Sequence, residues 1–366
     1  MPTIATLRAH WLALSCLPFA SVLAQEPPAD PLAQQIARLM RATERPNSPG
    51  AVVLVARGQH VLHQRAYGQA DLERAVPLQV DSVLDIGSTS KQFTAASLLL
   101  LEQDGALALG DGLRKHVKEL PPCFTPVTLR HLMLHTSGIP DYINLMVGAD
   151  APHHLEDRTT AEDALSALGK VEKLDFATGT KWAYSNSNYF LLSTVVERAC
   201  GLTLAAFAQK RLFEPLGMQH THVHVDCTQL VPGRALSYSR ARGGGWRWNF
   251  SNWEQTGDGA VMTTVGDLLK WARNFTTGTV GGEKLLAAMR QPGKLDDGSA
   301  IDYGAGLMFG DLEGTPCVSH GGAWAAYRAE LLRVPAADLV VVVLCNRDDL
   351  EPSAMARKIA QAALRG

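Results

Sequence analysis

The strongest constraint on the fold is that strand-forming segments stand near both ends of this 366-residue chain. Near the amino-terminal end, AVVLVARGQHVLHQRAYG (residues 51–68) contains two β-branched runs joined at residues 57–59, which predicts a hairpin. Near the other end, residues 316–319 and 325–334 are predicted strands. Residues 339–345 (LVVVVLC) are apolar at every position, which is typical of a strand buried on both faces. The two ends are therefore expected to pair in one sheet.

The long middle of the chain has helical patterns instead. Helices are predicted at 31–43, 87–105, 129–135, 160–168, 187–199, 204–212, 266–274 and 352–364. This order predicts an α/β (α+β) fold in which an antiparallel sheet, built from about 30–85 and 300–366, has flanking helices. The mainly helical segment at about 86–299 would be inserted as a second lobe. A functional site is expected in the cleft between the lobes.

Composition narrows the class of partner. Apolar residues make up 46% of the chain, which is enough for a large core, and the formal net charge is −2. The sequence contains no basic run and no block of like charge, so nucleic acid is not an expected partner. A small molecule or a peptide is the expected substrate. Beyond the amino terminus no apolar run approaches the ~20 residues of a membrane span.

Residues 1–24 have the pattern of an export signal, with a weakly basic start, a short apolar stretch and small residues before the change to polar sequence. Cleavage is expected near Ala24–Gln25, which would leave a domain of residues 25–366 in the periplasm or outside the cell. A lipid anchor on Cys16 is the alternative, although the leucine and serine before it are a poor lipidation context.

Five cysteines remain after removal of the signal: Cys123, Cys200, Cys227, Cys317 and Cys345. They are far apart and form no CxxC motif. In an exported protein one or two disulfides are compatible with this set, and the odd number leaves at least one thiol unpaired. The pattern does not indicate a disulfide scaffold, and the pairing stays open.

Candidate chemistry begins at Ser88 and Lys91 in the segment GSTSKQF. Residues three apart share a helix face, so the serine hydroxyl and the lysine amine can come within hydrogen-bonding distance. A serine needs an adjacent base to act as a nucleophile, and a position near a helix start favours negative charge on its oxygen. The alternative is a serine at a helix start with a solvated lysine one turn later, because SxxK alone is a weak pattern.

Two further motifs follow in order, Tyr184-Ser185-Asn186 and His320-Gly321-Gly322. The sequence SxxK, YxN and a basic residue with glycines in a carboxyl-terminal strand resembles the serine β-lactamase and penicillin-binding peptidase superfamily. It is most similar to the branch of class C β-lactamases, D-stereospecific peptidases and family VIII-type esterases. Flanking segments such as LRHLMLHTSGIPDY, FEPLGM and TGDGAVMTTVGDLLKWARNF agree. The resemblance covers about residues 32–364 and implies the β-lactamase/transpeptidase-like fold.

The resemblance also implies residue roles. Ser88 would be the acylated nucleophile, Lys91 would assist its deprotonation, and Tyr184 would act as the general base or share that task with Lys91. Asn186 would bind Lys91 or the substrate amide. The backbone N–H groups of Ser88 and Ala323 would form the oxyanion hole.

The third motif departs from the usual pattern of the family, because His320 stands where β-lactamases and transpeptidases usually have lysine. A histidine with its ordinary pKa near 6.5 is only a partial cation at pH 7, which implies a weaker attraction for anionic substrates. The glycines that follow, Gly321 and Gly322, would let a substrate lie against the strand edge.

The expected function is therefore that of an exported serine hydrolase acting on an ester or a small peptide amide. The peptide substrate could contain a D-amino acid. A β-lactamase or penicillin-binding DD-carboxypeptidase is the alternative. A catalytically silent ligand receptor is the alternative of another class. No cofactor is expected, because the resembled family uses none, and the chain has no GxSxG, HExxH or Walker-type motif.

Two residues are further candidates for substrate contact. Arg328 would bind a carboxylate from the strand after the oxyanion hole, or else face solvent. Trp248, in the aromatic segment 246–253, would line the cleft, or else belong to a loop that covers the helical lobe. The alternating His220, His222, His224 and Asp226 are interpreted as a polar strand or loop rather than a metal site, and His135 as a structural residue beside the cleft.

Overall fold

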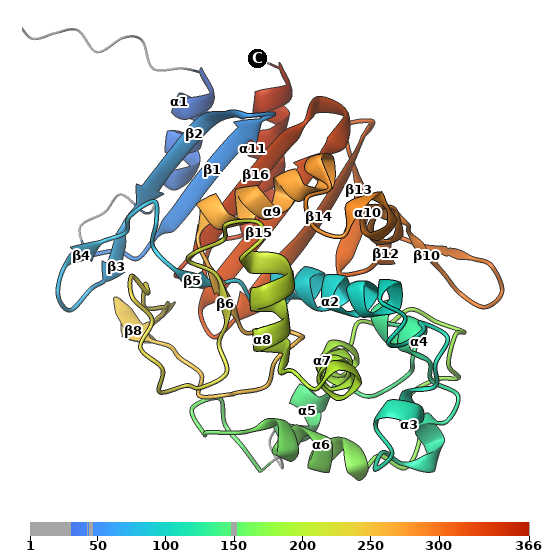
Figure 1. The fold of residues 1–366 in the computed structure, drawn as a ribbon. Coiled ribbons are helices and arrows are strands. Elements are labelled where there is room, and N and C mark those ends of the chain that lie inside the picture. Colours follow the sequence, from blue (N-terminus) through green and yellow to red (C-terminus); the bar gives the residue numbers. More distant parts are fainter. Residues whose placement is uncertain (1–30, 42, 44–46, 148–151, 366) are drawn as a thin grey trace, which may run out of the picture.

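The computed structural model describes residues 31–365 except 42, 44–46 and 148–151. Its central element is a seven-stranded antiparallel sheet with the strand order β12-β13-β14-β15-β16-β1-β2. The hairpin near the amino terminus therefore pairs with the last strand of the chain, as expected (Figure 1). The strands are β1 Ala51–Arg57, β2 His60–Tyr67, β12 Tyr303–Gly304, β13 Leu307–Leu312, β14 Thr315–Trp324, β15 Tyr327–Val334 and β16 Leu339–Cys345. Every residue of β16 is buried, which confirms the prediction for that segment.

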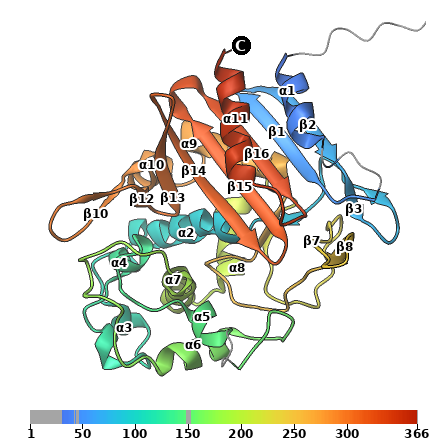
Figure 2. The same cartoon turned by 180° about the vertical axis from the view of Figure 1, so that it is seen from behind.

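Helices cover both faces of this sheet. On one face α1 (Pro31–Met40) and α11 (Pro352–Arg365) pack together, and α11 contacts β15 and β16 (Figure 2). On the other face α9 (Val265–Thr277) packs against β16 and β1. This helix lies inside the range 86–299 expected for the helical lobe, yet its apolar side completes the core of the sheet.

The helical lobe is built around α2 and α7, which contact each other (Figure 1). Its helices, with α10 packed against α2, are α2 Lys91–Gln103, α3 Leu113–His116, α4 Leu129–Met133, α5 Tyr142–Met146, α6 Ala161–Gly169, α7 Asn186–Cys200, α8 Leu204–Ala208 and α10 Gly282–Arg290. Short turns of other helix types are η1 Gly87–Ser90, η2 Pro122–Phe124, η3 Gln209–Phe213 and η4 Pro335–Ala337. Within the described residues no single helix is long and apolar enough to cross a membrane. Helix α7 and the segment α8–η3 would together be long and apolar enough, but the chain bends by 76° between them.

Four small sheets lie outside the central sheet in the described part of the chain, three of two strands and one of three. They are β3 Gln69–Asp71 with β4 Val76–Pro77, β5 Leu84–Asp85 and β6 His222–Val223 on either side of β9 Val261–Thr263, β7 Tyr238–Arg240 with β8 Trp246–Trp248, and β10 Gly293–Lys294 with β11 Ala300–Ile301. Strand β5 leads directly into η1, so this small sheet positions the start of the candidate site.

Two expected elements differ in their details. The continuous helix expected at 87–105 is a 3₁₀ turn, η1, followed by α2, and the reason lies at Gly87, whose positive φ of 48° bends the chain where it meets β14. The strand expected at 316–319 extends to Trp324, so His320, Gly321 and Gly322 lie inside β14 rather than after it. The ends of α2 and α7 agree with prediction, since Gly105 and Gly201 have positive φ.

Candidate active site

The candidate site is a cavity of about 170 Å³ that both lobes line. Its wall includes Ser88 from η1, Asn186 from the first turn of α7, and Ala323 and Trp324 from the end of β14. The three motifs, separated by about a hundred residues each in the sequence, therefore meet at one place.

Lys91 is the centre of the polar contacts. It is completely buried, and its Nζ lies 3.0 Å from Ser88 Oγ, 2.9 Å from Asn186 Oδ1 and 2.6 Å from the backbone oxygen of Asp258. A charged amine donates to all three acceptors. A neutral amine donates to Asn186 and Asp258 and keeps its lone pair for the Ser88 hydroxyl. The geometry therefore accommodates both protonation states that proton transfer requires.

Asp141 fixes the orientation of Asn186. Its Oδ2 accepts hydrogen bonds from the Asn186 side-chain Nδ2, at 2.9 Å, and from the Asn186 backbone N–H, at 2.8 Å. With its Nδ2 held in this way, the amide must present Oδ1 to Lys91. Asp141 also caps α5 by accepting from the Ile143 N–H at 2.9 Å.

Asp258 places a second carboxyl group beside the lysine. Its side chain is buried and accepts a hydrogen bond from the Tyr142 hydroxyl at 3.1 Å, while its backbone oxygen binds Lys91. Burial raises the pKa of the Asp258 carboxyl to about 6, and the nearby Lys91 opposes this rise. The segment TGDGA contains this residue but no signal that links it to Lys91, so its role was missed by sequence reasoning.

Tyr184 reaches Lys91 through its ring rather than its hydroxyl. The Nζ of Lys91 lies 4.9 Å from the centroid of the Tyr184 ring. The Tyr184 hydroxyl is buried and has no hydrogen-bond partner among the described residues. Buried hydroxyls are nearly always paired, so an unpaired hydroxyl on a residue whose ring contacts Lys91 is a group available to a substrate or to a transferred proton.

The glycines of the third motif allow β14 to approach η1 closely. A Cβ atom added to Gly322 would lie 1.8 Å from the Ile86 backbone oxygen and 3.1 Å from the Ser88 nitrogen, and one added to Gly87 would lie 2.6 Å from the Ala323 nitrogen. Only glycine fits these positions. The close approach brings the backbone of Ser88 next to that of Ala323, as an oxyanion hole requires.

His320 is a neutral residue in this structure. It is 1% exposed, its Nε2 lies 3.3 Å from the Tyr303 hydroxyl, and its Nδ1 lies 2.6 Å from the Gly321 oxygen. Burial, with a smaller effect of Lys91, lowers the pKa of His320 to about 4. The expectation of a partial cation at pH 7 is therefore wrong, because burial removes the charge almost entirely.

His135 is structural, as expected. It is fully buried with a positive φ of 58°, and its Nδ1 binds Asn188 Nδ2 at 2.9 Å and the Ser185 N–H at 3.3 Å. Its ring lies 4.3 Å from that of Tyr184, centroid to centroid. Burial and the charge of Lys91 lower the pKa of His135 well below its usual value. This imidazole therefore supports the YxN turn as a neutral group.

Two residues predicted to contact substrate lie elsewhere. Arg328 donates to the backbone oxygens of Ala325 and Tyr327, at 3.1 and 2.7 Å, and does not line the cavity. Successive residues of a strand point to opposite faces, so Tyr327 takes the cavity side and Arg328 the other. Trp248 is 53% exposed and stacks on Phe250 with ring centroids 4.3 Å apart, and Phe250 is the residue of that pair that lines the cavity.

The cation that does line the cavity is Arg234, which sequence reasoning did not select. Its Nε and the Nδ1 of His224 are buried without hydrogen-bond partners among the described residues. Asp85, also in the wall, binds the Gly87 N–H at 2.7 Å, and burial raises the pKa of the Asp85 carboxyl to about 6. Burial and Arg234 lower the pKa of His224 to about 4, so this imidazole is neutral at pH 7.

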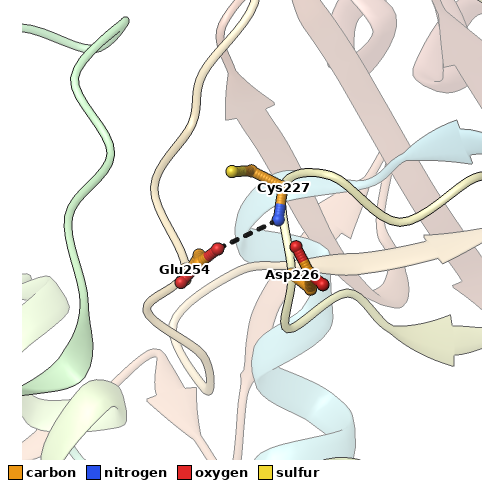
Figure 3. A group of neighbouring side chains, drawn as sticks. All are labelled: Asp226, Cys227 and Glu254. Atoms are coloured by element: carbon orange, nitrogen blue, oxygen red, sulfur yellow. Dashed lines mark hydrogen bonds between the residues drawn. The ribbon is translucent and has the colours of Figure 1, made fainter.

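The acidic cluster near the alternating histidines has protein partners. Only His222 and Val223 form a strand there, and Asp226, Cys227 and Glu254 have ligand atoms within 4.8 Å of one another (Figure 3). Glu254 accepts from the Cys227 N–H and pairs with Arg158 at 3.0 Å, and the exposed Asp226 binds Thr228. These contacts join three loops through hydrogen bonds, and the pairing with an arginine makes Glu254 a poor metal ligand.

The five cysteines described are all free, so none of the bridges considered from the sequence is present among them. Cys317 and Cys345 are buried, and burial raises the pKa of both thiols. Residues 1–24, with the expected export signal and Cys16, lie outside the described residues.

Known proteins share this fold and sequence pattern. The family model Beta-lactamase matches residues 32–365. Penicillin-binding protein 4* of Bacillus subtilis (strain 168) is 28% identical over 319 residues, which cover 81% of this chain and 68% of that protein. A D-aminopeptidase of Gluconobacter oxydans (strain 621H) is 28% identical over 317 residues, which cover 86% of this chain but 59% of that protein, so the chain spans about three fifths of its length.

Among solved structures, the octameric penicillin-binding protein homologue from Pyrococcus abyssi has a TM-score of 0.79 and 26% identity, covering 92% of this chain and 77% of that one. This similarity extends over both lobes. With the family match over residues 32–365, it establishes that the chain belongs to the Beta-lactamase family, whose members are serine hydrolases.

Proposed function

We propose that this protein forms an acyl-enzyme on Ser88 and hydrolyses an ester or a small peptide amide, with D-amino-acid amides as the preferred peptide class. The observation that carries this proposal is the set of three hydrogen bonds from the buried Lys91 to Ser88, Asn186 and Asp258. A structural lysine at a helix start would be solvated, whereas this one is held against a serine hydroxyl.

The reaction follows from the geometry. Ser88 Oγ attacks the substrate carbonyl carbon, and its proton passes to the neutral amine of Lys91 or to the phenolate form of Tyr184. The Ser88 and Ala323 N–H groups stabilise the resulting oxyanion, and the leaving group departs with the transferred proton. Water then attacks the acyl-enzyme by the reverse proton path and releases the acid.

The neutral His320 supports ester and peptide substrates over those recognised by a cation at this position. The similarity to a D-aminopeptidase points to the same class, although the chain spans only 59% of that relative. A second candidate, a penicillin-binding or β-lactam-hydrolysing enzyme, is supported by the similarity to Penicillin-binding protein 4* and by Arg234, a cation in the cavity wall.

Labelling of the nucleophile tests the proposal. The protein is incubated with a fluorophosphonate and with a fluorescent penicillin, and its intact mass is measured. One adduct on the wild type and none on Ser88→Ala is expected. An adduct that survives Ser88→Ala, or none from either probe, would refute the assignment and favour the silent receptor.

Comparison of kcat/KM separates the substrate classes. A short-chain p-nitrophenyl ester, a D-alanine p-nitroanilide, its L-enantiomer and nitrocefin are measured with the same preparation. The proposal expects the ester and the D-amide to exceed nitrocefin and the L-amide. A preference for nitrocefin would replace it with the second candidate.

Export belongs to the same proposal and rests on the pattern of residues 1–24. Expression of the full chain in a bacterial host, followed by mass measurement of the periplasmic protein, should give a mature chain that begins near Gln25. Recovery of the uncleaved chain in the cytoplasm would contradict it.

A further inference from the structure

A buried arginine near the end of β15 lies outside the candidate active site. Arg333 is 7% exposed, and no carboxylate among the described residues lies within ion-pair distance of it. Its guanidinium forms no hydrogen bond to any described residue either. Buried charges in proteins are normally paired, because removal of an ion from water is strongly unfavourable. The guanidinium nitrogens of Arg333 are not among the fully buried unpaired atoms, so they remain accessible from the cavity that Arg333 lines and can take an anionic partner there.

The sheet register determines where this side chain points. Arg333 pairs with Val318 of β14 and Val340 of β16, and its neighbours in the strand, Leu332 and Val334, pack in the core on the α1–α11 side. Arg333 therefore faces the α9 side, where its guanidinium carbon lies 3.5 Å from the centroid of the Phe275 ring. A cation–π contact offsets only part of the desolvation of a guanidinium.

A second cation shares the cavity. Arg290, at the end of α10, lines the same space of about 370 Å³, where it pairs with Glu283 at 3.0 Å and binds the Phe275 oxygen. Burial, with a smaller effect of Arg290, lowers the pKa of Arg333 to about 9, so the guanidinium is still charged at pH 7.

Negative groups lie near the cavity, but none of those described contacts Arg333. Asp338 is the acidic residue that lines this cavity among the described residues, and it is exposed. The carboxyl-terminal end of α9 contributes about half an elementary negative charge, and Arg290 already binds the free oxygen of Phe275 there. Arg333 is therefore left without a direct anionic partner among the described residues.

We propose that this space, the Arg333 cavity, binds an anion with a carboxylate or phosphate head and an apolar body. A guanidinium presents parallel N–H donors that match either head group. The rest of the wall is largely apolar and would enclose a short hydrocarbon body; it includes Ala272, Phe275, Val318, Pro335 and Val340. This inference does not depend on the proposed hydrolase activity.

Binding is tested on the full chain with three probes, octanoate, octyl phosphate and inorganic phosphate, by titration calorimetry and thermal unfolding. Octanoate and octyl phosphate should raise Tm in a saturable way and bind more tightly than inorganic phosphate. Arg333→Met should weaken their binding by about tenfold or more, as expected for loss of a charge-assisted hydrogen bond. Arg242→Gln, a change at an exposed arginine, is the matched control and should bind as the wild type does.

A second measurement, thermal unfolding without an anion, distinguishes a loss of binding from misfolding of the variant. Without any anion, Arg333→Met should unfold at the same temperature as the wild type or higher, because a buried unpaired charge becomes an apolar side chain of similar length. A large drop in Tm would show that Arg333 already has a partner and would overturn the proposal. So would the absence of saturable binding by any probe, or equal binding by the wild type and Arg333→Met. Inorganic phosphate that binds as tightly as octyl phosphate would refute the apolar body.

Discussion

The Nε2 atom of His320 lies 3.3 Å from the hydroxyl oxygen of Tyr303, and both side chains are buried. The same imidazole contacts the Gly321 oxygen through Nδ1. Among the described residues its environment offers hydrogen bonds but no anion to balance a charge, and burial lowers its pKa to about 4, so His320 stays neutral over the physiological range. In this protein the third motif therefore shapes the strand edge and leaves the role of cation to Lys91 and Arg234.

The low pKa of His320 predicts a stability effect. The folded state holds this group at a pKa of about 4, against about 6.5 when unfolded, so protons bind the unfolded chain more readily as pH falls from 6.5 to 4. Between pH 7 and pH 4.5 the free energy of unfolding of the wild type should therefore fall by about 2–3 kcal/mol more than that of His320→Gln. The buried Asp85 and Asp258, whose pKa values are raised to about 6, act in the opposite direction but equally in both proteins.

Urea unfolding at the two pH values measures this difference. His154→Gln, at an exposed position, is the control and should follow the wild type. Equal losses for His320→Gln and the wild type would show that His320 is not held neutral by the fold.

Replacement of Lys91 tests the base. Lys91→Met keeps the length of the side chain but removes the amine that contacts Ser88 Oγ, so kcat/KM for the ester should fall by about 10²–10⁴. Steady-state kinetics measure the loss, and circular dichroism checks the fold. Lys170→Met, on the exposed end of α6, should retain full activity. Activity within a factor of a few of the wild type would assign the proton transfer to Tyr184 alone.

The neighbouring glycines of β14 make a matched pair. Gly322→Ala forces a methyl group against the Ile86 oxygen and must displace β14 from η1, so kcat should fall by about 10²–10³ through the oxyanion hole. In Gly321→Ala the methyl group lies on the other face, 2.9 Å from the Glu330 carboxylate that Ser353 binds and away from the Ile86 oxygen, so kcat should fall much less than in Gly322→Ala. Similar losses in the two variants would argue against the close approach as the reason for Gly322.

Arg234 and Arg328 make a second pair. Arg234→Gln should lower kcat/KM for esters whose acyl part carries a carboxylate, relative to neutral esters, by roughly tenfold, since a charged hydrogen bond is lost. Arg328→Gln should leave that ratio unchanged, because its side chain binds the hairpin backbone outside the cavity. The ratio of the two kcat/KM values is the measurement, and a change confined to Arg328→Gln would reverse the assignment.

Much of the architecture could be predicted from local patterns. A run of seven apolar residues was enough to locate β16, and the spacing of Ser88 and Lys91 was enough to place hydroxyl and amine on one side of a helical turn. These features depend on periodicity and chain stereochemistry over a few residues, and both can be recognised in the sequence alone.

Other features depend on contacts between distant segments. Whether Arg328 faces the cavity depends on which face of β15 is turned toward the helical lobe, and that face is the one of Tyr327. Arg234 reaches the cavity from a loop with no regular pattern. The charge of His320 depends on how deeply the fold buries it. The sequence by itself thus determined most of the elements and selected Ser88 as the proposed nucleophile. Only the tertiary structure decided which cations line the cavity, because burial and side-chain direction depend on how distant segments pack and not on residue order.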